Sequence, residues 1–424
     1  MYVRTVRSQV PAVPAPQEDW IYNEHQGRNE LAGATIGVSL SGGGYRATLF
    51  AAGAVAALAD GQVWDQVKWV ASVSGGSFVN AAAGLELPDD PTARAVDRFL
   101  RMVAERVARR LWPIALPQRT SRIRGLALVA RSYDAGIQRH WVGADRGAVP
   151  LANLQHPSRT HAFLAVDLAT LSPVVLSDRL VYSPGLRDEP VALAPGGLRL
   201  ATAIRSSASF PGLPSTHVRS EDLGTVYHPL YDDLHLGDGG VWNNLGTEWE
   251  RLLGEVGRVD LGDVAAFARP VEFHVVVDAS APAKRPKTWR TRRWPTTLDW
   301  PFLSLDRALH AAFQSTLENS RRALRDGSGK IPRRILHVSL EEIPRTQQVL
   351  SALVGGAEPE EWAAVADQNG TVGTACPTLW GIRGLPAVHL MAHGYAQTAA
   401  CLTARGVPLQ HFEIPHERIY RAIT

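Results

Sequence analysis

The stretch Ile36-Gly-Val-Ser-Leu-Ser-Gly-Gly-Gly-Tyr-Arg46 decides the fold class of this 424-residue chain. It joins a short apolar run, typical of a buried strand, to a glycine turn and then to an alanine-rich helix expected over Arg46–Ala59. The same order returns in Trp69-Val-Ala-Ser-Val-Ser-Gly-Gly-Ser77, between a strand expected over Val67–Val73 and a helix over Gly76–Leu85. Successive strand–turn–helix units predict an α/β fold, with a parallel sheet covered by helices on both faces.

The rest of the chain continues this pattern. Further strands are expected at Ala162–Leu168, Val174–Ser177, Val271–Val277 and Ile335–Leu340, and further helices at Thr92–Leu111, Leu198–Ser207, Phe302–Leu324 and Leu385–Leu402. We interpret residues 1–33 as an N-terminal arm and residues 34–424 as one domain. Within that domain, a basic helical insertion is expected at about 92–132 and a basic loop at about 283–295.

The amino-acid composition indicates an ordinary globular protein but does not indicate its function. An apolar content of 45% and a charged content of 20% are ordinary for a globular chain. The net charge of +3 is mildly basic and favours anionic surfaces without selecting a partner. Two cysteines, Cys376 and Cys401, are too few for a disulfide framework.

The N-terminal residues contain no apolar core of a signal peptide, and the most apolar stretch, Leu49–Leu58, is too short to span a bilayer. We therefore expect a cytoplasmic protein that meets membranes, if at all, at their surface.

Ser74 is the candidate nucleophile, because it stands where a strand passes into a helix through a sharp turn. In the nucleophile elbow, small residues two before and two after the serine permit the strained backbone. Ser72 and Gly76 hold these places, so the match to Gly-x-Ser-x-Gly is imperfect at Ser72. Serines beside glycines also occur in ordinary turns, and this turn alone leaves both interpretations open.

The glycines Gly42, Gly43 and Gly44 admit three interpretations. They are a tight connection without a ligand, a dinucleotide site matching Gly-x-Gly-x-x-Ala, or an oxyanion hole built from N–H groups at a helix N-terminus. A dinucleotide site expects an acidic residue at the end of the second strand, where this chain has Ser72-Val-Ser74. That placement weakens the dinucleotide interpretation.

Asp238 is the candidate base for the serine. It lies between glycines in Leu236-Gly-Asp-Gly-Gly-Val-Trp-Asn-Asn244, although an Asp-Gly pair is also a common turn. None of the 14 histidines has a comparable setting. His389 and His393 are one helical turn apart, but with no third ligand indicated we expect them at a helix surface or in packing. A Ser–Asp dyad without histidine is the simpler proposal.

Together these segments resemble the patatin-like and cytosolic phospholipase A group of lipid acyl hydrolases. Ser41-Gly-Gly-Gly-Tyr-Arg-Ala47 and Ser74-Gly-Gly-Ser77 resemble the cytosolic branch, whereas Asp238-Gly-Gly240 resembles the patatin branch. Ser206-Ser-Ala-Ser-Phe-Pro211 is similar to the segment that precedes the family's catalytic aspartate, and Val276-Val-Asp-Ala-Ser280 to a later strand end. The resemblance implies a central, mostly parallel sheet sandwiched by helices. The basic helical insertion at about 92–132 is expected to be cap-like.

The resemblance also implies roles for individual residues. Ser74 and Asp238 would form the catalytic dyad, the amides of Gly42, Gly43 and Gly44 the oxyanion hole, and Arg46 a site for the substrate phosphate. The implied reaction is cleavage of fatty acyl esters of phospholipids or lysophospholipids, with no cofactor and no metal in catalysis. The alternatives are a Rossmann-type nucleotide-binding oxidoreductase and a catalytically silent lipid-binding scaffold.

A phospholipid membrane surface, of anionic character, is the expected partner. The segment Lys284-Arg-Pro-Lys-Thr-Trp-Arg-Thr-Arg-Arg-Trp294 combines basic side chains, which attract anionic headgroups, with tryptophans, which favour the interface. Such a run is equally compatible with a solvated basic surface. No recognised nucleic-acid-binding module accompanies it, so we expect no nucleic-acid partner.

Overall fold

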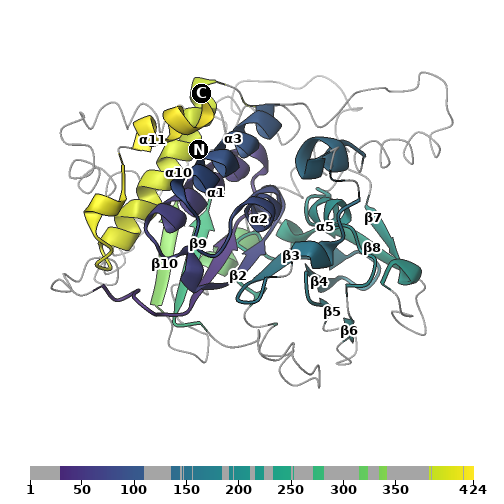
Figure 1. Cartoon of the computed structure of the whole chain (residues 1–424). Coiled ribbons are helices and arrows are strands. Elements are labelled where there is room, and N and C mark those ends of the chain that lie inside the picture. Colours follow the sequence, from purple (N-terminus) through teal and green to yellow (C-terminus); the bar gives the residue numbers. More distant parts are fainter. Residues whose placement is uncertain are drawn as a thin grey trace, which may run out of the picture.

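A ten-stranded sheet forms the centre of the protein (Figure 1). The computed structural model describes residues 29–108, 135–143, 146, 148–154, 156–183, 191–193, 195–210, 215–223, 233–249, 252, 271–280, 315–322, 334–340, 382, 384–413 and 415–424. Its strands are β1 (Ile36–Leu40), β2 (Val67–Ser72), β3 (Thr160–Asp167), β4 (Ser172–Ser177), β5 (Val181–Ser183), β6 (Val191–Leu193), β7 (Thr216–Arg219), β8 (Asp233–Asp238), β9 (Phe273–Asp278) and β10 (Arg334–Ser339).

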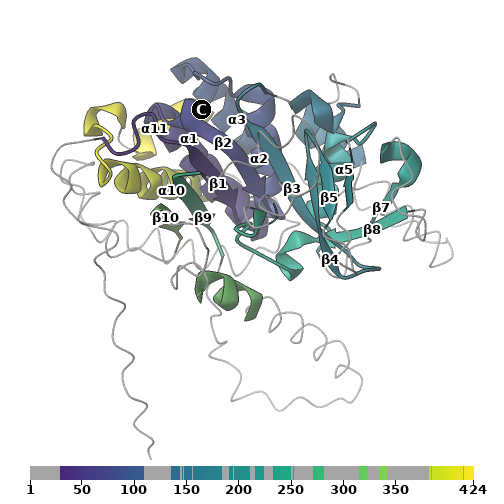
Figure 2. The same cartoon turned by 90° about the horizontal axis from the view of Figure 1, so that it is seen from below.

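The sheet has a parallel half and an antiparallel half, which meet at β3. Strands β10, β9, β1, β2 and β3 pair in parallel, in that order. Beyond β3 the pairs β3–β4, β4–β5, β5–β6, β3–β8 and β7–β8 are antiparallel. Figure 2 shows this progression from β10 and β9 at one side to β7 and β8 at the other. The parallel half confirms the expected α/β sheet.

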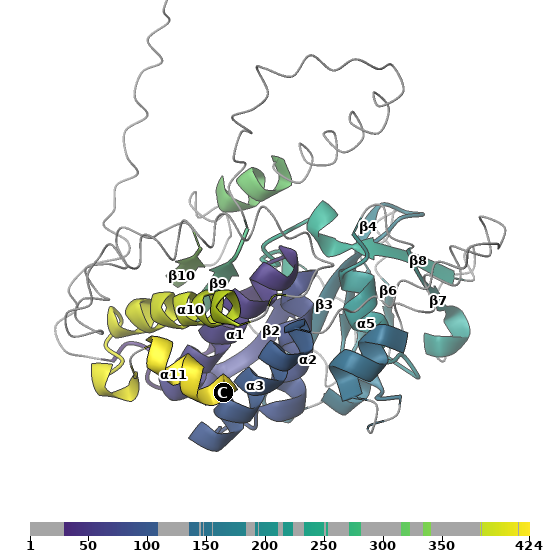
Figure 3. The same ribbon diagram turned by 90° about the horizontal axis from the view of Figure 1, so that it is seen from above.

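One face of the sheet carries a thick layer of helices (Figure 3). The helices include α1 (Gly44–Asp60), α2 (Gly75–Glu86), α3 (Ala93–Ala108), α5 (Leu200–Ser207), α10 (Leu385–Thr403) and α11 (Pro415–Ile423), with short helical turns at Trp64–Gln66, Gln138–Gly143, Leu151–Leu154, Ser220–Leu223, Gly239–Val241 and Leu409–His411. The apolar side chains of α1, α2, α3 and α10 join one face of the strands in the largest hydrophobic cluster.

The opposite face of the sheet is also covered. There, Trp69, Ala71 and Val73 of the β2 region pack with Trp249 and Leu252. Beside them, Val276 of β9 packs with Leu245 and with Leu317, which lies in the helical residues 315–322. The sheet is therefore sandwiched, as expected from the sequence.

Strand β1 shows how the sequence distributes side chains between these layers. Ile36, Val38 and Leu40 alternate toward the helical layer, as a strand's period of two requires. Gly37 faces the other way, where a Cβ atom would lie 2.2 Å from the Trp69 ring. The glycine at this position therefore allows a tryptophan of the neighbouring strand to fill the second layer.

Helices α1 and α10 cross at unusually short range. A Cβ atom on Gly53 would lie 1.8 Å from the carbonyl oxygen of Met391, and one on Gly394 would lie 1.9 Å from that of Phe50. Each glycine thus lies against the backbone of the other helix, and the two helices, more than 300 residues apart in sequence, form the centre of the helical layer.

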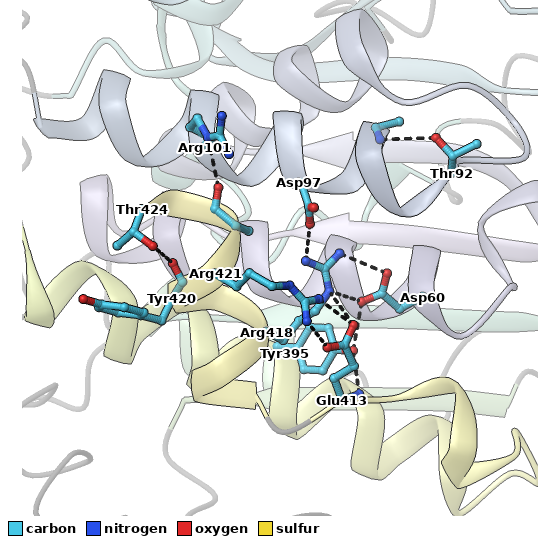
Figure 4. A network of polar contacts seen from close by, with 12 residues as sticks. Asp60, Thr92, Asp97, Arg101, Tyr395, Glu413, Arg418, Tyr420, Arg421 and Thr424 are labelled. Atoms are coloured by element: carbon cyan, nitrogen blue, oxygen red, sulfur yellow. Dashed lines mark hydrogen bonds and ion pairs between the residues drawn. The ribbon is translucent and has the colours of Figure 1, made fainter.

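The C-terminal helix α11 is held by a buried arginine (Figure 4). The guanidinium of Arg418 donates to Asp60 at the end of α1, with an Nε–Oδ2 distance of 2.9 Å, and to Asp97 of α3. The hydroxyl of Tyr395 in α10 donates to the same Asp60 carboxylate at 2.9 Å. One polar cluster therefore joins α1, α3, α10 and α11.

Several sequence expectations fall partly or wholly outside the described residues. These are most of the N-terminal arm, the basic loop at about 283–295, and the second part of the insertion at about 92–132. The first part of that insertion, α3, buries Val96, Phe99 and Val103 in the main core and packs against α1, α2 and α11. This part belongs to the helical layer, and a cap formed by the remainder stays a prediction.

Candidate active site

The site forms where β2 and β8 run toward each other along one edge of β3. Strand β2 pairs with Thr160–Phe163, and β8 pairs with Ala165–Asp167 from the opposite direction. The other edge of β3 is occupied by β4 along Ala162–Asp167. Ser74 follows the end of β2, and Asp238, the last residue of β8, is paired with Ala165. This meeting of strand ends brings Ser74 and Asp238 together from distant parts of the chain.

Ser74 occupies a strained backbone position at the start of α2. Its φ of 50° and ψ of −116° lie where a residue with a side chain is rarely found. The two following glycines allow this turn to pack tightly: a Cβ atom on Gly75 would lie 2.2 Å from the carbonyl oxygen of Gly44, and one on Gly76 would lie 2.5 Å from that of Leu40. The geometry is that of the strand-to-helix elbow expected from the sequence.

Ser72 fills the place where the elbow motif has glycine, and its hydroxyl is used structurally. Its Oγ donates to the carbonyl of Ala162 at 3.0 Å and accepts from the side-chain amide of Asn80 at 2.9 Å. The Ser77 hydroxyl lies 3.1 Å from the same oxygen. A serine is therefore accommodated at position 72 because polar neighbours on β3 and α2 satisfy it.

Asp238 is buried, and one carboxylate oxygen is already engaged. Oδ1 accepts the N–H of Gly240 at 2.7 Å, whereas Oδ2 has no hydrogen-bond partner among the described residues. Burial raises the pKa of Asp238 to about 6, against the opposing effects of the Gly240 N–H and the Ser74 hydroxyl. The hydroxyl is thus close enough to stabilise the carboxylate, although it makes no hydrogen bond of normal length to Oδ2.

The glycine turn after β1 lies beside Ser74. Gly43 has a φ of 140° and Gly44 a φ of 64°, so this turn uses conformations that favour glycine. Gly44 opens α1 and lies against Gly75, the first residue of α2, and the Thr48 hydroxyl of α1 donates to the Gly75 carbonyl at 2.8 Å. The N-termini of two helices therefore meet at the candidate nucleophile.

The amide of Gly42 departs from the expectation. It donates to the carbonyl oxygen of Asn244 at 2.9 Å, so its single hydrogen is not directed at a ligand. No acceptor for the amides of Gly43 and Gly44 is found in the described part of the chain, as is usual for the first turn of a helix. The structure therefore leaves Gly43 and Gly44 as the available donors of the predicted trio.

Arg46 lies in the first turn of α1, beneath this glycine turn. It is nearly buried, and its Nε donates to the carbonyl of Ala279 at 3.0 Å. A terminal guanidinium nitrogen lies 3.0 Å from where a Cβ atom on Gly43 would stand. The positive charge is thus fixed next to the glycine turn, where the sequence predicted it.

Comparison with known proteins agrees with this arrangement. Residues 38–248 match the family profile described as patatin-like phospholipase. This part of the chain is a patatin-like phospholipase domain. This domain contains Ser74, Asp238, the three glycines and Arg46.

The chain was also compared with solved structures and with curated proteins. Among solved structures, the chain is similar to human GIVD cytosolic phospholipase A2, with a TM-score of 0.47 and 15% sequence identity. The match covers 92% of this chain and 63% of that one, so the chain spans less than two thirds of the length of that protein. No curated protein matches the sequence.

Residues outside the patatin-like domain support its glycine turn. The side chain of Asn244 donates to the Ser280 hydroxyl at 2.9 Å, and the Ser280 amide donates to Asp278 at the end of β9. Oδ2 of the Asp278 carboxylate lies 2.7 Å from a guanidinium nitrogen of Arg321 and 3.3 Å from Nε2 of His337. Although burial alone would raise the pKa of Asp278, His337 and Arg321 together hold it well below its usual value.

Sequence reasoning did not identify Asn244 or Ser207 as contributors to this site. Asn244 binds the Gly42 amide through its carbonyl, and Ser207 binds the Ser74 amide. The available signal was positional: Asn244 closes the motif that begins at Leu236, and Ser207 lies in the serine-rich segment before Pro211. Nothing in either residue type distinguishes such a role from an ordinary turn.

The two histidines that are one helical turn apart in the sequence, His389 and His393, both lie in α10. His393 is buried in α10, hydrogen-bonds Gln397 at 3.2 Å, and has its pKa lowered to about 4 by burial. His389 contacts His416 of α11. Within the described ranges, no group of three or more His, Cys, Asp or Glu side chains could hold a metal ion. A search of the same residues found no helix of the length and apolarity required to cross a membrane.

Proposed function

We propose that this protein hydrolyses fatty acyl esters of phospholipids or lysophospholipids with Ser74 as nucleophile and Asp238 as base. The observation that carries the proposal is the meeting of β2 and β8, which sets a strained serine against a buried carboxylate. The pKa of Asp238, about 6, leaves it ionised at neutral pH yet more basic than an exposed carboxylate. The Oδ2 oxygen is the one left to accept the Ser74 proton.

The reaction proceeds in two steps through an acyl-enzyme. Asp238 takes the hydroxyl proton while Ser74 Oγ attacks the ester carbonyl carbon, and the tetrahedral intermediate expels the glycerol oxygen, which receives that proton from Asp238. Water then attacks the acyl-enzyme and gives a proton to Asp238, and Asp238 passes that proton to Ser74 Oγ as the bond between Oγ and the acyl carbon breaks and the fatty acid leaves. Amides of Gly43 and Gly44, at the positive end of α1, stabilise the oxyanion in both steps.

Arg46 is proposed to bind the phosphate of the substrate. Its charge stands beside Gly43, so a phosphate there would lie next to the ester that occupies the oxyanion hole. A dinucleotide at the same turn has less support, because β2 ends at Ser72 and no acidic residue follows that strand end.

Intact-protein mass measured after treatment with a fluorophosphonate tests the dyad. We expect one adduct on the wild-type protein, none on folded Ser74→Ala, and strongly reduced labelling of Asp238→Asn. Hydrolysis of a phospholipid and of the matching lysophospholipid by the same three proteins then gives the substrate class. Substantial hydrolysis by folded Ser74→Ala would reject the proposal, and labelling without hydrolysis of any lipid would favour the scaffold alternative.

The membrane partner is proposed from the basic segment Lys284–Trp294 together with the amphipathic substrate. Sedimentation with neutral and with anionic phosphatidylserine vesicles tests it. We expect binding to anionic vesicles that weakens as salt is raised, because exposed charges are screened. Equal, salt-insensitive binding to both vesicles would remove the electrostatic role of the segment.

A further inference from the structure

The segment formed by the last residue of α5 and the two residues after it, Ser207–Ser209, contacts both members of the proposed dyad through the backbone. The amide of Ser74 donates to the carbonyl oxygen of Ser207 at 3.1 Å, and the amide of Asp238 donates to that of Ser209 at 3.0 Å. Two residues of one segment therefore hold the two reacting residues, which themselves come from different strands.

The Ser207 hydroxyl adds three hydrogen bonds to this backbone contact with Ser74, and they fix its geometry. Its Oγ donates to the carbonyl of Leu164 at 2.7 Å, accepts the Ser74 amide at 3.1 Å and accepts the Ser77 hydroxyl at 2.8 Å. One proton and two lone pairs are the whole capacity of a hydroxyl, so its orientation is fixed. The side chain is fully buried, where an unmade hydrogen bond is costly.

These partners are adjacent to both reacting groups. Leu164 precedes Ala165, the β3 residue paired with Asp238, and Ser77 lies one turn into the helix that Ser74 begins. Ser209 is fixed in turn, because its hydroxyl donates to the Arg205 carbonyl at 2.8 Å and lies 3.0 Å from the Thr216 hydroxyl of β7. The segment is thus anchored at three strands around the site.

We propose that Ser207 is a positioning residue, whose hydroxyl sets the Ser74 elbow against Asp238 by hydrogen bonds to the Ser74 amide and to β3. This inference rests on the proposed dyad. Ser74 holds an unfavourable φ, and a second acceptor on its amide restrains that conformation. Without the hydroxyl, the amide keeps only the Ser207 carbonyl, and the serine oxygen loses its alignment with the base.

The test compares Ser207→Ala with Ser206→Ala. Ser206 is the neighbouring buried serine on α5, but its hydroxyl bonds only the Thr202 carbonyl of the same helix, at 2.8 Å, among the contacts described. The readouts are the rate of fluorophosphonate labelling, kcat and KM on a soluble p-nitrophenyl ester, and Tm. For Ser207→Ala we expect labelling and kcat to fall by roughly tenfold to a hundredfold, with KM within about twofold, because misplacement of a reacting group acts on the rate.

Further variants keep the inference falsifiable if Ser207→Ala folds poorly. Ser77→Ala removes one hydrogen bond to the Ser207 hydroxyl and should lower kcat in the same direction but less. Ser207→Thr keeps a hydroxyl and should restore part of the labelling rate. Wild-type labelling by Ser207→Ala, or equal losses in Ser207→Ala and Ser206→Ala that follow their Tm values, would overturn the positioning role.

The two proposals fail separately. If Ser74→Ala abolishes labelling while Ser207→Ala labels normally, the dyad stands and the positioning role falls. If folded Ser74→Ala still hydrolyses ester, the dyad itself is wrong, whatever Ser207→Ala does.

Discussion

Asp238 determines how activity should depend on pH. Its carboxyl is buried, and burial raises its pKa to about 6. Because the proposed mechanism needs the ionised form to accept the serine proton, it predicts that kcat/KM rises with pH through about 6 and then levels off. Initial rates on a soluble ester between pH 4.5 and 8.5 measure this profile. A rate that keeps falling from pH 5 to pH 8 would contradict Asp238 as the base.

The same raised pKa predicts the stability of Asp238→Asn. A buried carboxyl that prefers its neutral form stabilises the fold below its unfolded pKa, near 4, and loses that contribution as pH rises through about 6. Asparagine keeps an oxygen for the Gly240 amide without a charge. Relative to wild type, the variant should therefore gain about 1–3 kcal/mol in unfolding free energy between pH 4 and pH 8. Urea denaturation at both pH values measures the gain, and its absence would mean that the Asp238 charge is well solvated.

For single residues, the sequence indicates candidate reacting groups more readily than the residues that hold those groups in place. Ser74, Asp238 and the glycine turn could be singled out as candidates because the proposed reaction or a strained turn calls for each of these residue types. The engagement of Gly42 with Asn244 could not, because it depends on where a carbonyl over 200 residues away lies. Hydrogen bonds of this kind leave no pattern in a single sequence.

Among the elements, the crossing of α1 and α10 is the least tolerant of added volume. Gly53→Ala and Gly394→Ala each place a methyl group within 2 Å of a carbonyl oxygen in the facing helix. The helices must then separate, and we expect the free energy of unfolding to fall by about 1–3 kcal/mol or more. Thermal or urea denaturation measures the loss.

Gly84→Ala is the matched control for these two variants. Gly84 is also helical, but its added methyl would meet only side chains of Leu154 and His161, at 3.1 Å and 3.2 Å. Alanine also favours a helix over glycine by about 1 kcal/mol. We expect this variant to be near wild type in stability. If Gly53→Ala were equally stable, the close approach of α1 and α10 would be wrong.

Elements formed by local patterns were predicted, and those formed by distant pairing were not. Strands β1, β2 and β9 are apolar runs, and helices α1 and α2 follow glycine turns, so each has a signal of its own. The short strands β5, β6 and β7 have too few residues for a periodic pattern. The meeting of β2 and β8 on one edge of β3 emerges only from the sheet register.

For the molecule as a whole, Arg418 is the main polar link between the chain's C-terminal end and its first helices. Its side chain is almost fully buried, and the carboxylates of Asp60 and Asp97 hold its pKa above the usual value despite the effect of burial. Arg418→Ala would leave Asp60 without its cation, so we expect a loss of about 3–5 kcal/mol in unfolding free energy. Denaturation followed by tryptophan fluorescence measures this loss.

Arg421→Ala is the control for this cluster. Arg421 is largely exposed and pairs with Glu413 on the same side of the molecule (Figure 4). Exposed pairs contribute about 1 kcal/mol or less. If both arginine variants cost the same, the buried cluster around Arg418 stabilises the fold no more than an exposed ion pair does. Where Arg418→Ala remains folded, Ser74 should still react with a fluorophosphonate, because the described partners of Arg418, Asp60, Asp97 and Glu413, lie outside the site.

The sequence predicts the sandwiched sheet of the whole molecule. It does not show that elements beyond the end of the family profile complete this sheet. Alternating strands and helices indicate a sandwiched sheet, and the family profile agrees over residues 38–248. The profile ends before β9, β10 and α10, yet these elements complete the sheet, the helical layer and the support of Gly42 through Asn244 and Asp278. Such completion by later residues depends on tertiary packing.

The positive φ of Ser74 also has an evolutionary meaning. A side chain in this sparsely populated conformation costs roughly 1–3 kcal/mol, and glycine would relieve it. A lineage that no longer used the hydroxyl would gain stability from Ser74→Gly, so drift under selection for folding alone would tend to erase the serine. In descendants of this chain, the residue at position 74 should therefore separate working enzymes from those that have kept only the scaffold.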